Sequence, residues 1–214
     1  ALRDFSPGRL VQVIQGAAVL TIILNAVSMW KQEPRRPLRG GPEPPADPTF
    51  RETWARFRRT DRTLLHLGVV GLGTLAFGMA DILLEPFGGQ VLGMTVSATT
   101  TLTALFAFGG LVGFAAASHA IGHGTSAYRT AQVGAGLGVP AFLAVILAAP
   151  LAHPLLFVAG NFLIGFGAAL FSHGTLTATM NRAPRDQAGL ALGAWGSVQA
   201  TCAGLAIGLS GVLR

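Results

Sequence analysis

Six long apolar segments, separated by polar stretches, dominate the pattern of the chain. They cover residues 10–29, 64–84, 95–118, 128–149, 155–172 and 187–209. Each is close to the ~20 residues that a helix needs to cross the hydrocarbon core of a bilayer, and none alternates apolar and polar positions as a barrel strand does. The pattern therefore predicts an all-α integral membrane protein with six transmembrane helices.

The polar stretch after the first predicted helix differs from the others. Residues 31–63 are rich in arginine, and residues 31–47 also carry many prolines, as a linker does. Phe50, Trp54 and Phe57 then recur at spacings of four and three, which predicts a short basic helix with one aromatic edge. Such a helix is typical of a segment on an anionic membrane surface, so anionic lipids are the expected partner. Because the basic stretch adjoins a membrane helix, nucleic acid is not an expected partner.

Composition agrees with a division into a first transmembrane helix (1–30), a basic loop (31–63) and a five-helix membrane bundle (64–214). Hydrophobic residues make up 51% of the 214 residues and charged residues only 11%, and the mean hydropathy is +0.55. A soluble protein could not cover its surface with so few charges. The net charge of +6 is concentrated in the basic loop. The positive-inside rule places that loop in the cytoplasm and both ends of the chain on the other side.

The 29 glycines indicate close packing of helices, because small residues let helix backbones approach each other in a membrane. Small residues recur every four positions in three of the predicted helices: Gly109 and Gly113, Gly134 and Gly138, and the two ladders Gly189–Gly193–Ser197 and Ala200–Gly204–Gly208. We expect the first two pairs to lie in helix contacts. The two ladders predict that the last helix packs on two sides.

Candidate binding residues begin near the end of the second predicted helix. Asp81 and Glu85 lie four residues apart, on one face of a helix that we expect to end before Pro86 and the pair Gly88-Gly89. Carboxylates in such a place can face water, cap a neighbouring helix, or meet a ligand or a partner. The simplest interpretation is contact with water, because Asp81 would lie only ~5 Å of helix rise from the end of the helix.

The sequence contains no phosphate-binding loop, Cys/His metal cluster or nucleophile motif, so neither an enzyme nor a metal site is expected. Of the five histidines, His66 and His173 lie nearest to apolar helix. A neutral imidazole can ligate a metal such as the magnesium of a chlorin, which makes His173, and less so His66, a candidate pigment ligand. A histidine at a helix end more often faces water.

Several separated motifs give the chain a family resemblance. They occupy residues 13–18, 30–33, 77–92, 163–167 and 191–201. In this order they resemble the PucC/LhaA family, the bacteriochlorophyll-delivery branch of the major facilitator superfamily in phototrophic bacteria. On this resemblance the six predicted helices correspond to helices six to eleven of a twelve-helix fold, and the chain is part of a longer protein.

The resemblance implies an assembly factor for light-harvesting antenna complexes in the bacterial inner, intracytoplasmic photosynthetic membrane. In that membrane the positive-inside rule places the basic loop in the cytoplasm and both ends of the chain in the periplasm. Such a factor would bind or deliver bacteriochlorophyll, antenna polypeptides or both, and would meet the reaction centre–antenna complex. The candidate binding residues are Asp81, Glu85, Gln90, His173, Trp195 and Gln199.

Two alternatives remain open. An ion-coupled transporter of a small molecule is the commonest function of the superfamily, but such proteins usually carry charges at mid-membrane depth, and no Asp, Glu, Lys or Arg lies at the centre of a predicted helix. A structural subunit stably bound in a pigment complex would make the same contacts as an assembly factor.

Overall fold

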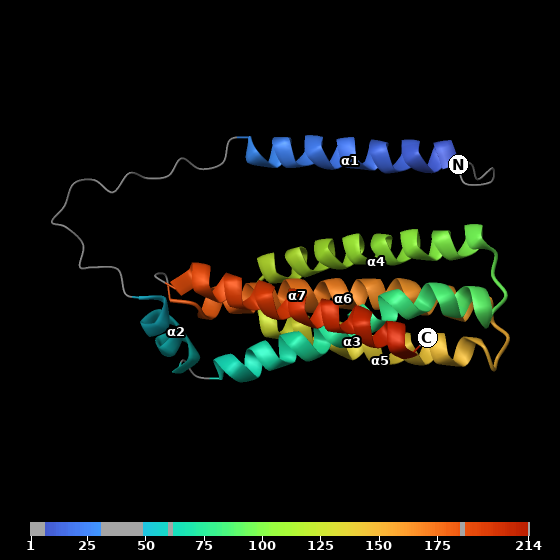
Figure 1. Ribbon diagram of the computed structural model, residues 1–214. Coiled ribbons are helices and arrows are strands. Elements are labelled where there is room, and N and C mark those ends of the chain that lie inside the picture. The colour runs from blue at the N-terminus through green and yellow to red at the C-terminus, as the bar shows by residue number, and fades with distance from the viewer. Residues whose placement is uncertain (1–6, 31–48, 60–61, 185–186, 214) are drawn as a thin grey trace. The chain divides into compact units, whose positions relative to one another are not determined.

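The computed structural model describes residues 7–30, 49–59, 62–184 and 187–213, and the predicted linker at 31–47 lies outside these residues. All regular secondary structure in the described residues is α-helical (Figure 1). The helices are α1 (Pro7–Met29), α2 (Phe50–Arg59), α3 (Thr63–Gln90), α4 (Val96–Gly122), α5 (Ala127–Ala148), α6 (Pro154–Arg182) and α7 (Ala188–Leu213). Contacts between residues divide the chain into two units, Ala1–Pro48 with α1 and Thr49–Arg214 with α2 to α7.

Five helices of the second unit, α3 to α7, are long and apolar enough to cross a membrane. In the first unit, α1 contains a shorter apolar segment, Val11–Val27, near the lower limit of ~17 residues for a membrane-spanning helix. The predicted class, an all-α membrane protein, is confirmed.

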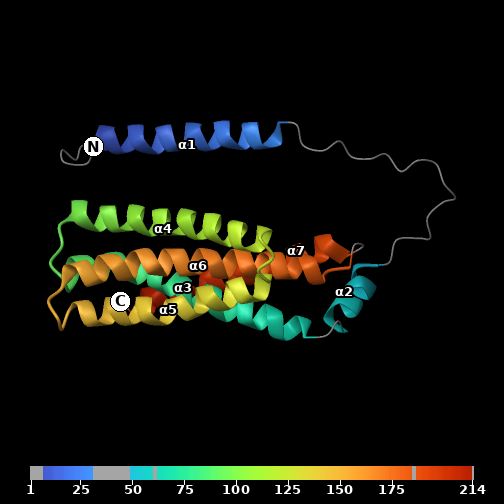
Figure 2. The same ribbon diagram turned by 180° about the vertical axis from the view of Figure 1, so that it is seen from behind.

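Helix α6 is the centre of the second unit. It lies between α4 and α5 in both ribbon views (Figures 1 and 2), and it also contacts α3 and α7. Deep in this packing, Asn161 of α6 is only 2% exposed. Its Nδ2 donates a hydrogen bond of 2.6 Å to the carbonyl oxygen of Leu102 in α4. A buried amide is thus satisfied by a neighbouring helix, as a membrane interior requires.

Glycines allow α6 to approach both neighbours closely. A Cβ added to Gly113 of α4 would lie 2.5 Å from the carbonyl oxygen of Phe166, and Gly109 faces Phe162 in the same way. On the other side, a Cβ on Gly134 of α5 would lie 2.6 Å from the carbonyl oxygen of Gly167. The predicted contacts at these glycines are confirmed: a side chain at any of the three positions would force the backbones apart.

The two small-residue ladders of α7 do not pack within the described chain. A Cβ added to any of their glycines would meet nothing within 4 Å: Gly189, Gly193, Gly204 and Gly208. Helix α7 instead contacts α3 through Val198, Cys202 and Ala206, which face Gly71 and Gly78. Helix α7 does contact two neighbours, α3 and α6, but the predicted packing through the small-residue ladders is wrong for the described residues, because the glycines of α3 admit the larger side chains of α7.

Helix α3 does not end where the sequence predicts. It continues through Pro86 to Gln90, although a proline removes one helical hydrogen bond and crowds the preceding turn. Tertiary packing holds the last turn in place: Gly88 is buried, and a Cβ there would lie 3.2 Å from the ring of Phe157. As a consequence, Asp81 lies nine residues before the end of α3, which is ~13 Å of helix rise and not ~5 Å.

Helix α6 also continues beyond its predicted end at Ser172 and reaches Arg182. The added turns carry hydroxyl side chains, which interrupt the apolar pattern expected of a membrane-spanning helix. Thr175 donates to the carbonyl oxygen of Ser172 at 3.1 Å, and Thr179 donates to that of Thr175 at 2.8 Å. Because these hydroxyls bond to their own helix, they can be buried without ending it.

The short basic helix α2 forms as predicted, but its aromatic edge faces protein more than lipid. Phe57 is 6% exposed and packs with Leu67 of α3 and Ala191 of α7, and Trp54 packs against the same cluster. Only Phe50, the third aromatic residue, is largely exposed, at 73%. The sequence predicts that all three aromatic residues face lipid, and this is wrong for Phe57, because Phe57 packs instead on an apolar surface at the ends of α3 and α7.

Candidate functional site

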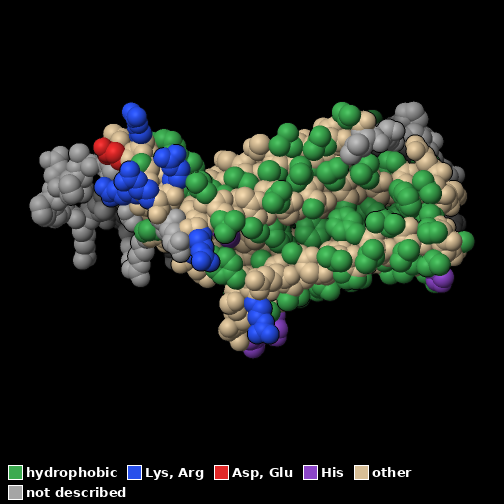
Figure 3. All heavy atoms as spheres, turned by 90° about the horizontal axis from the view of Figure 1, so that it is seen from below, with side chains coloured by type: hydrophobic (Ala, Val, Ile, Leu, Met, Phe, Trp, Pro, Cys, Tyr) green, Lys and Arg blue, Asp and Glu red, His purple; other side chains and the backbone are tan. Residues whose placement is uncertain are grey.

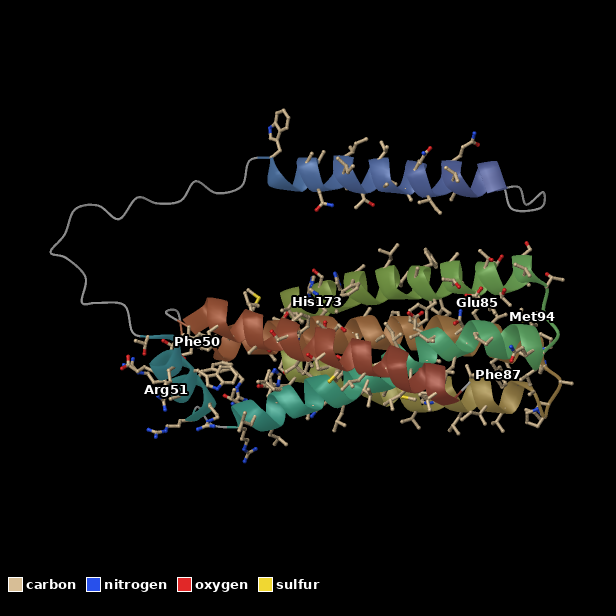
Figure 4. All side chains as sticks on the ribbon, in the orientation of Figure 1. Phe50, Arg51, Glu85, Phe87, Met94 and His173 are labelled. Atoms are coloured by element: carbon tan, nitrogen blue, oxygen red, sulfur yellow. The ribbon has the colours of Figure 1, made fainter. Side chains whose placement is uncertain are left out.

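The structure places the six predicted site residues in three separate regions. Asp81, Glu85 and Gln90 lie in the last turns of α3, His173 lies on α6, and Trp195 and Gln199 lie on α7. Figure 4 shows Glu85 at one end of the second unit and His173 toward the other end. The six residues therefore do not form one site in the described chain.

Glu85 and Gln90 line one groove between the end of α3 and the start of α4, which we call the α3–α4 groove. It has a volume of about 340 Å³ and includes Met94 and Thr99 on its other side. The chain between the helices is fixed by a hydrogen bond of 3.0 Å from the N–H of Met94 to the carbonyl oxygen of Gly88. Glu85, Phe87 and Met94 lie together at this end of the bundle (Figure 4). Two of the predicted residues thus share a preformed groove.

Asp81 lies one turn before Glu85 but does not line the α3–α4 groove. Its side chain is exposed on the surface of the second unit. The pair that the sequence suggests is therefore divided, with one carboxylate in the groove and the other beside it.

The donors in the α3–α4 groove fit the central magnesium of a chlorin by their chemistry. Magnesium prefers oxygen ligands, and Glu85 offers a carboxylate and Gln90 an amide oxygen. The groove is at the lower end of the volumes typical of small-ligand sites, so it would cover one part of a large pigment. Among the described residues, no group of three or more His, Cys, Asp or Glu could hold a free metal ion.

Trp195 and Gln199 connect α7 to α6. Nε1 of Trp195 donates to the hydroxyl of Thr175 at 3.3 Å, and Nε2 of Gln199 donates to the hydroxyl of Ser172 at 3.4 Å. Both side chains are partly buried in this contact. In the described chain they hold two helices together, and a role in pigment binding stays a prediction.

His173 is partly buried on α6, and its ring meets that of Phe114 of α4 edge-on, with 6.1 Å between the ring centres. His173 does not line the α3–α4 groove. Its proposed ligand role is likewise still a prediction.

A polar cluster that the sequence interpretation largely missed lies at the opposite end of the bundle. Nη1 of Arg182 donates to the hydroxyl of Tyr128 at 2.7 Å, and Nε2 of His66 is 2.8 Å from the hydroxyl of Thr179. Thr175, Thr179 and Arg182 follow helical spacing on α6, a signal that only becomes visible once residues 155–182 are treated as one helix. The cluster adjoins a pocket of about 500 Å³.

Charge is distributed unevenly over the second unit. On the face shown in Figure 3, the arginine side chains lie toward one end, and hydrophobic side chains cover most of the remaining surface. The end with the positive charge is the end of α2 and of the cluster around Arg182, opposite the α3–α4 groove. This polarity along the helices agrees with an orientation across a membrane.

Comparisons with known proteins match the chain along its whole length. A family model described as PUCC protein matches residues 1–214. Protein PucC of Rhodovulum sulfidophilum is 53% identical over 219 residues, and Protein PucC of Cereibacter sphaeroides is 51% identical over 214 residues. Both alignments cover 100% of this chain, but only 47% and 46% of the two relatives. The chain thus spans about half the length of these relatives.

A more distant relative is the bacteriochlorophyll synthase 44.5 kDa chain of Rhodobacter capsulatus. It is 28% identical over 215 residues, which cover 95% of this chain and 48% of the relative. No solved structure matches the chain.

Proposed function

Because the chain belongs to the PucC family, we propose that the longer protein assists the assembly of light-harvesting antenna complexes in the bacterial photosynthetic membrane. Family membership is the observation that carries this proposal. The name of a distant relative, which refers to bacteriochlorophyll synthesis, supports a connection to the same pigment. In this proposal the protein is not an enzyme: it binds bacteriochlorophyll, antenna polypeptides or both, and passes them on unchanged to the reaction centre–antenna complex.

The depth of Asp81 supports a binding function for the outer surface of α3. In this proposal the end of α3 lies at the membrane surface, which places Asp81, ~13 Å from that end, near half the ~30 Å thickness of the hydrocarbon core. An ionisable residue at such depth usually faces protein or a water-filled cavity, because a charge exposed to lipid is costly. Asp81 is exposed on the second unit, and in this proposal another part of the longer protein, a pigment or a client helix covers it.

Glu85 and Gln90 are the residues that would make the specific contacts. Either oxygen donor of the α3–α4 groove would hold the magnesium of bacteriochlorophyll, the pigment that supplies light absorption to the antenna. The same groove, with Met94 on its wall, would equally accept a polar group of an antenna polypeptide.

An ion-coupled transporter remains the second candidate, and one observation favours it. Asp81 is deeper in α3 than the sequence suggests, and an acid at that depth is typical of coupling sites. Reconstitution distinguishes the two functions: a transporter accumulates a solute in vesicles, whereas an assembly factor shows no uptake.

The test of the proposed function is Glu85→Gln in the full-length protein, expressed in a phototroph that lacks its own copy. We expect less antenna absorption per reaction centre with an unchanged amount of inserted protein, because the substitution removes the negative charge and keeps the size of the side chain. Glu52→Gln is the matched control: Glu52 lies on α2, where its carboxylate accepts a hydrogen bond of 3.2 Å from the N–H of Thr49. Normal antenna levels in Glu85→Gln would show that the negative charge of Glu85 has no part in assembly.

A further inference from the structure

A pocket opens between α3 and α5 at the end of the bundle that carries the polar cluster; we call it the α3–α5 pocket. Further along the two helices, Phe77 of α3 touches α5, since a Cβ on Gly138 would lie 3.2 Å from its ring. Toward the other end the helices separate and leave a volume of about 500 Å³ above Phe171 and Thr175 of α6. This volume is within the range of small-ligand sites.

The polar side of the α3–α5 pocket is basic. Arg62 and Arg182 both line it, together with His66, Tyr128 and Gln132. Both guanidinium groups already interact with other groups, but a guanidinium carries several N–H donors and can bind a carboxylate or a phosphate through two of them in addition.

The hydrogen bonds of the cluster fix the direction of its donors. The hydroxyl of Tyr128 accepts a bond from Nη1 of Arg182 at 2.7 Å, so its own proton is available to a ligand. The hydroxyl of Thr179 donates to the carbonyl oxygen of Thr175 at 2.8 Å, so it accepts from Nε2–H of His66. The bond from Arg182 holds Tyr128 in place, and the bond to Thr179 does the same for His66.

The other side of the pocket is apolar and open to the flank of the bundle. Leu65 and Val69 of α3 form one wall and are 64% and 47% exposed, and Ala131 and Ala135 of α5 form the opposite wall. Phe171 of α6, 3% exposed, forms the floor. A chain of methylene groups could therefore lie between α3 and α5 and continue toward the surrounding lipid.

We propose that the α3–α5 pocket binds an amphiphile with a single anionic group, either phosphate or carboxylate. The anionic group lies at Arg62, Arg182 and the hydroxyl of Tyr128, and the apolar chain lies along Leu65 and Val69. Basic pockets between membrane helices bind acidic headgroups in this way. The site is separate from the α3–α4 groove, at the other end of the bundle, and does not depend on the proposed function.

The test measures amphiphiles retained by the purified full-length protein in native mass spectrometry. Phosphatidylglycerol, oleate, phosphatidylcholine and inorganic phosphate are added separately. We expect retention of phosphatidylglycerol, oleate or both, and none of phosphatidylcholine or inorganic phosphate. Preference for phosphatidylglycerol identifies a phosphate site and preference for oleate a carboxylate site. Equal retention of phosphatidylcholine would overturn the proposal, and so would retention of inorganic phosphate alone.

Variants locate the binding. Arg182→Gln should weaken retention about tenfold or more, because it removes a charged hydrogen-bond donor. Arg129→Gln is the control, since Arg129 is an exposed arginine on α5 that does not line the pocket. Equal weakening by both variants would show a general attraction of anions and overturn the proposal.

Val69→Trp is a second variant that leaves the hydrogen bonds intact and fills the apolar side. Because Val69 is 47% exposed, the larger side chain can be accommodated on the bundle surface even if Arg182→Gln fails to fold. We expect it to reduce retention of the acyl chain about tenfold or more. Unchanged retention in Val69→Trp would contradict the placement of the chain along α3.

Discussion

Gly113→Ala tests the close contact between α4 and α6. The added Cβ would lie 2.5 Å from the carbonyl oxygen of Phe166, which is 0.9 Å closer than the 3.4 Å at which ordinary contact begins, and 2.9 Å from Cβ of Ala169. Both opposing atoms belong to backbone or to a short side chain, so the helices themselves have to move apart. Overpacking of this kind costs about 1–3 kcal/mol, whereas alanine in place of glycine favours a helix by about 1 kcal/mol.

Gly110→Ala is the matched control on the same helix. Its Cβ would meet nothing closer than the carbonyl oxygen of Gly165, at 3.9 Å, so it gains helix propensity without a clash. We expect Gly113→Ala to lower the free energy of unfolding and Gly110→Ala to leave it unchanged or raise it, with a difference of about 1–3 kcal/mol between the two variants.

The assay is unfolding of the full-length protein in mild detergent by added sodium dodecyl sulfate, followed by circular dichroism. A common midpoint for the two variants would refute the α4–α6 contact, because helix propensity alone predicts the same change at both positions.

Two further variants test other contacts. Asn161→Ala should lower the free energy of unfolding by at least about 1 kcal/mol, because the hydrogen bond to Leu102 is lost and a cavity remains. The control Thr101→Ala removes an exposed hydroxyl bonded to its own helix and should have little effect in the same unfolding assay. Equal effects of the two variants would contradict the burial of Asn161. Phe57→Ala should release α2 from the bundle and increase the cleavage of α2 by trypsin several-fold, because a core phenylalanine contributes about 3–5 kcal/mol to stability. The control Phe50→Ala, at an exposed position, should be cleaved like the unmodified protein. Unchanged cleavage of Phe57→Ala would show that α2 is not docked on the bundle.

The membrane helices and their closest contacts could be predicted from the sequence, because both depend on local pattern. Apolar length identifies a helix in a bilayer, where every backbone group needs an internal partner. Gly109, Gly113 and Gly134 were identifiable as contact residues because small residues four apart lie on one helix face. The same reasoning was wrong for the ladder at Gly204 and Gly208, since the spacing shows that a face can pack but not whether a neighbouring helix covers it.

The helix ends and the polar pocket could not be predicted, because tertiary contacts determine them. Pro86 favours an end to α3, but the packing of Gly88 on Phe157 outweighs the lost hydrogen bond. The α3–α5 pocket combines Tyr128 and Arg182, 54 positions apart in the chain, and no local motif connects them. The groove was only partly predictable: the sequence singles out Glu85, but its pairing with Met94 depends on how α4 packs on α3.

Purification of the tagged full-length protein from phototrophically grown cells tests the proposed function most directly. The absorption spectrum and the mass spectrum of the purified material report bound pigment and bound polypeptides together. An assembly factor predicts that bacteriochlorophyll or antenna polypeptides accompany the protein and decrease in the Glu85→Gln variant. A colourless protein without antenna polypeptides, which accumulates a solute after reconstitution in vesicles, would contradict the proposal and establish a transporter.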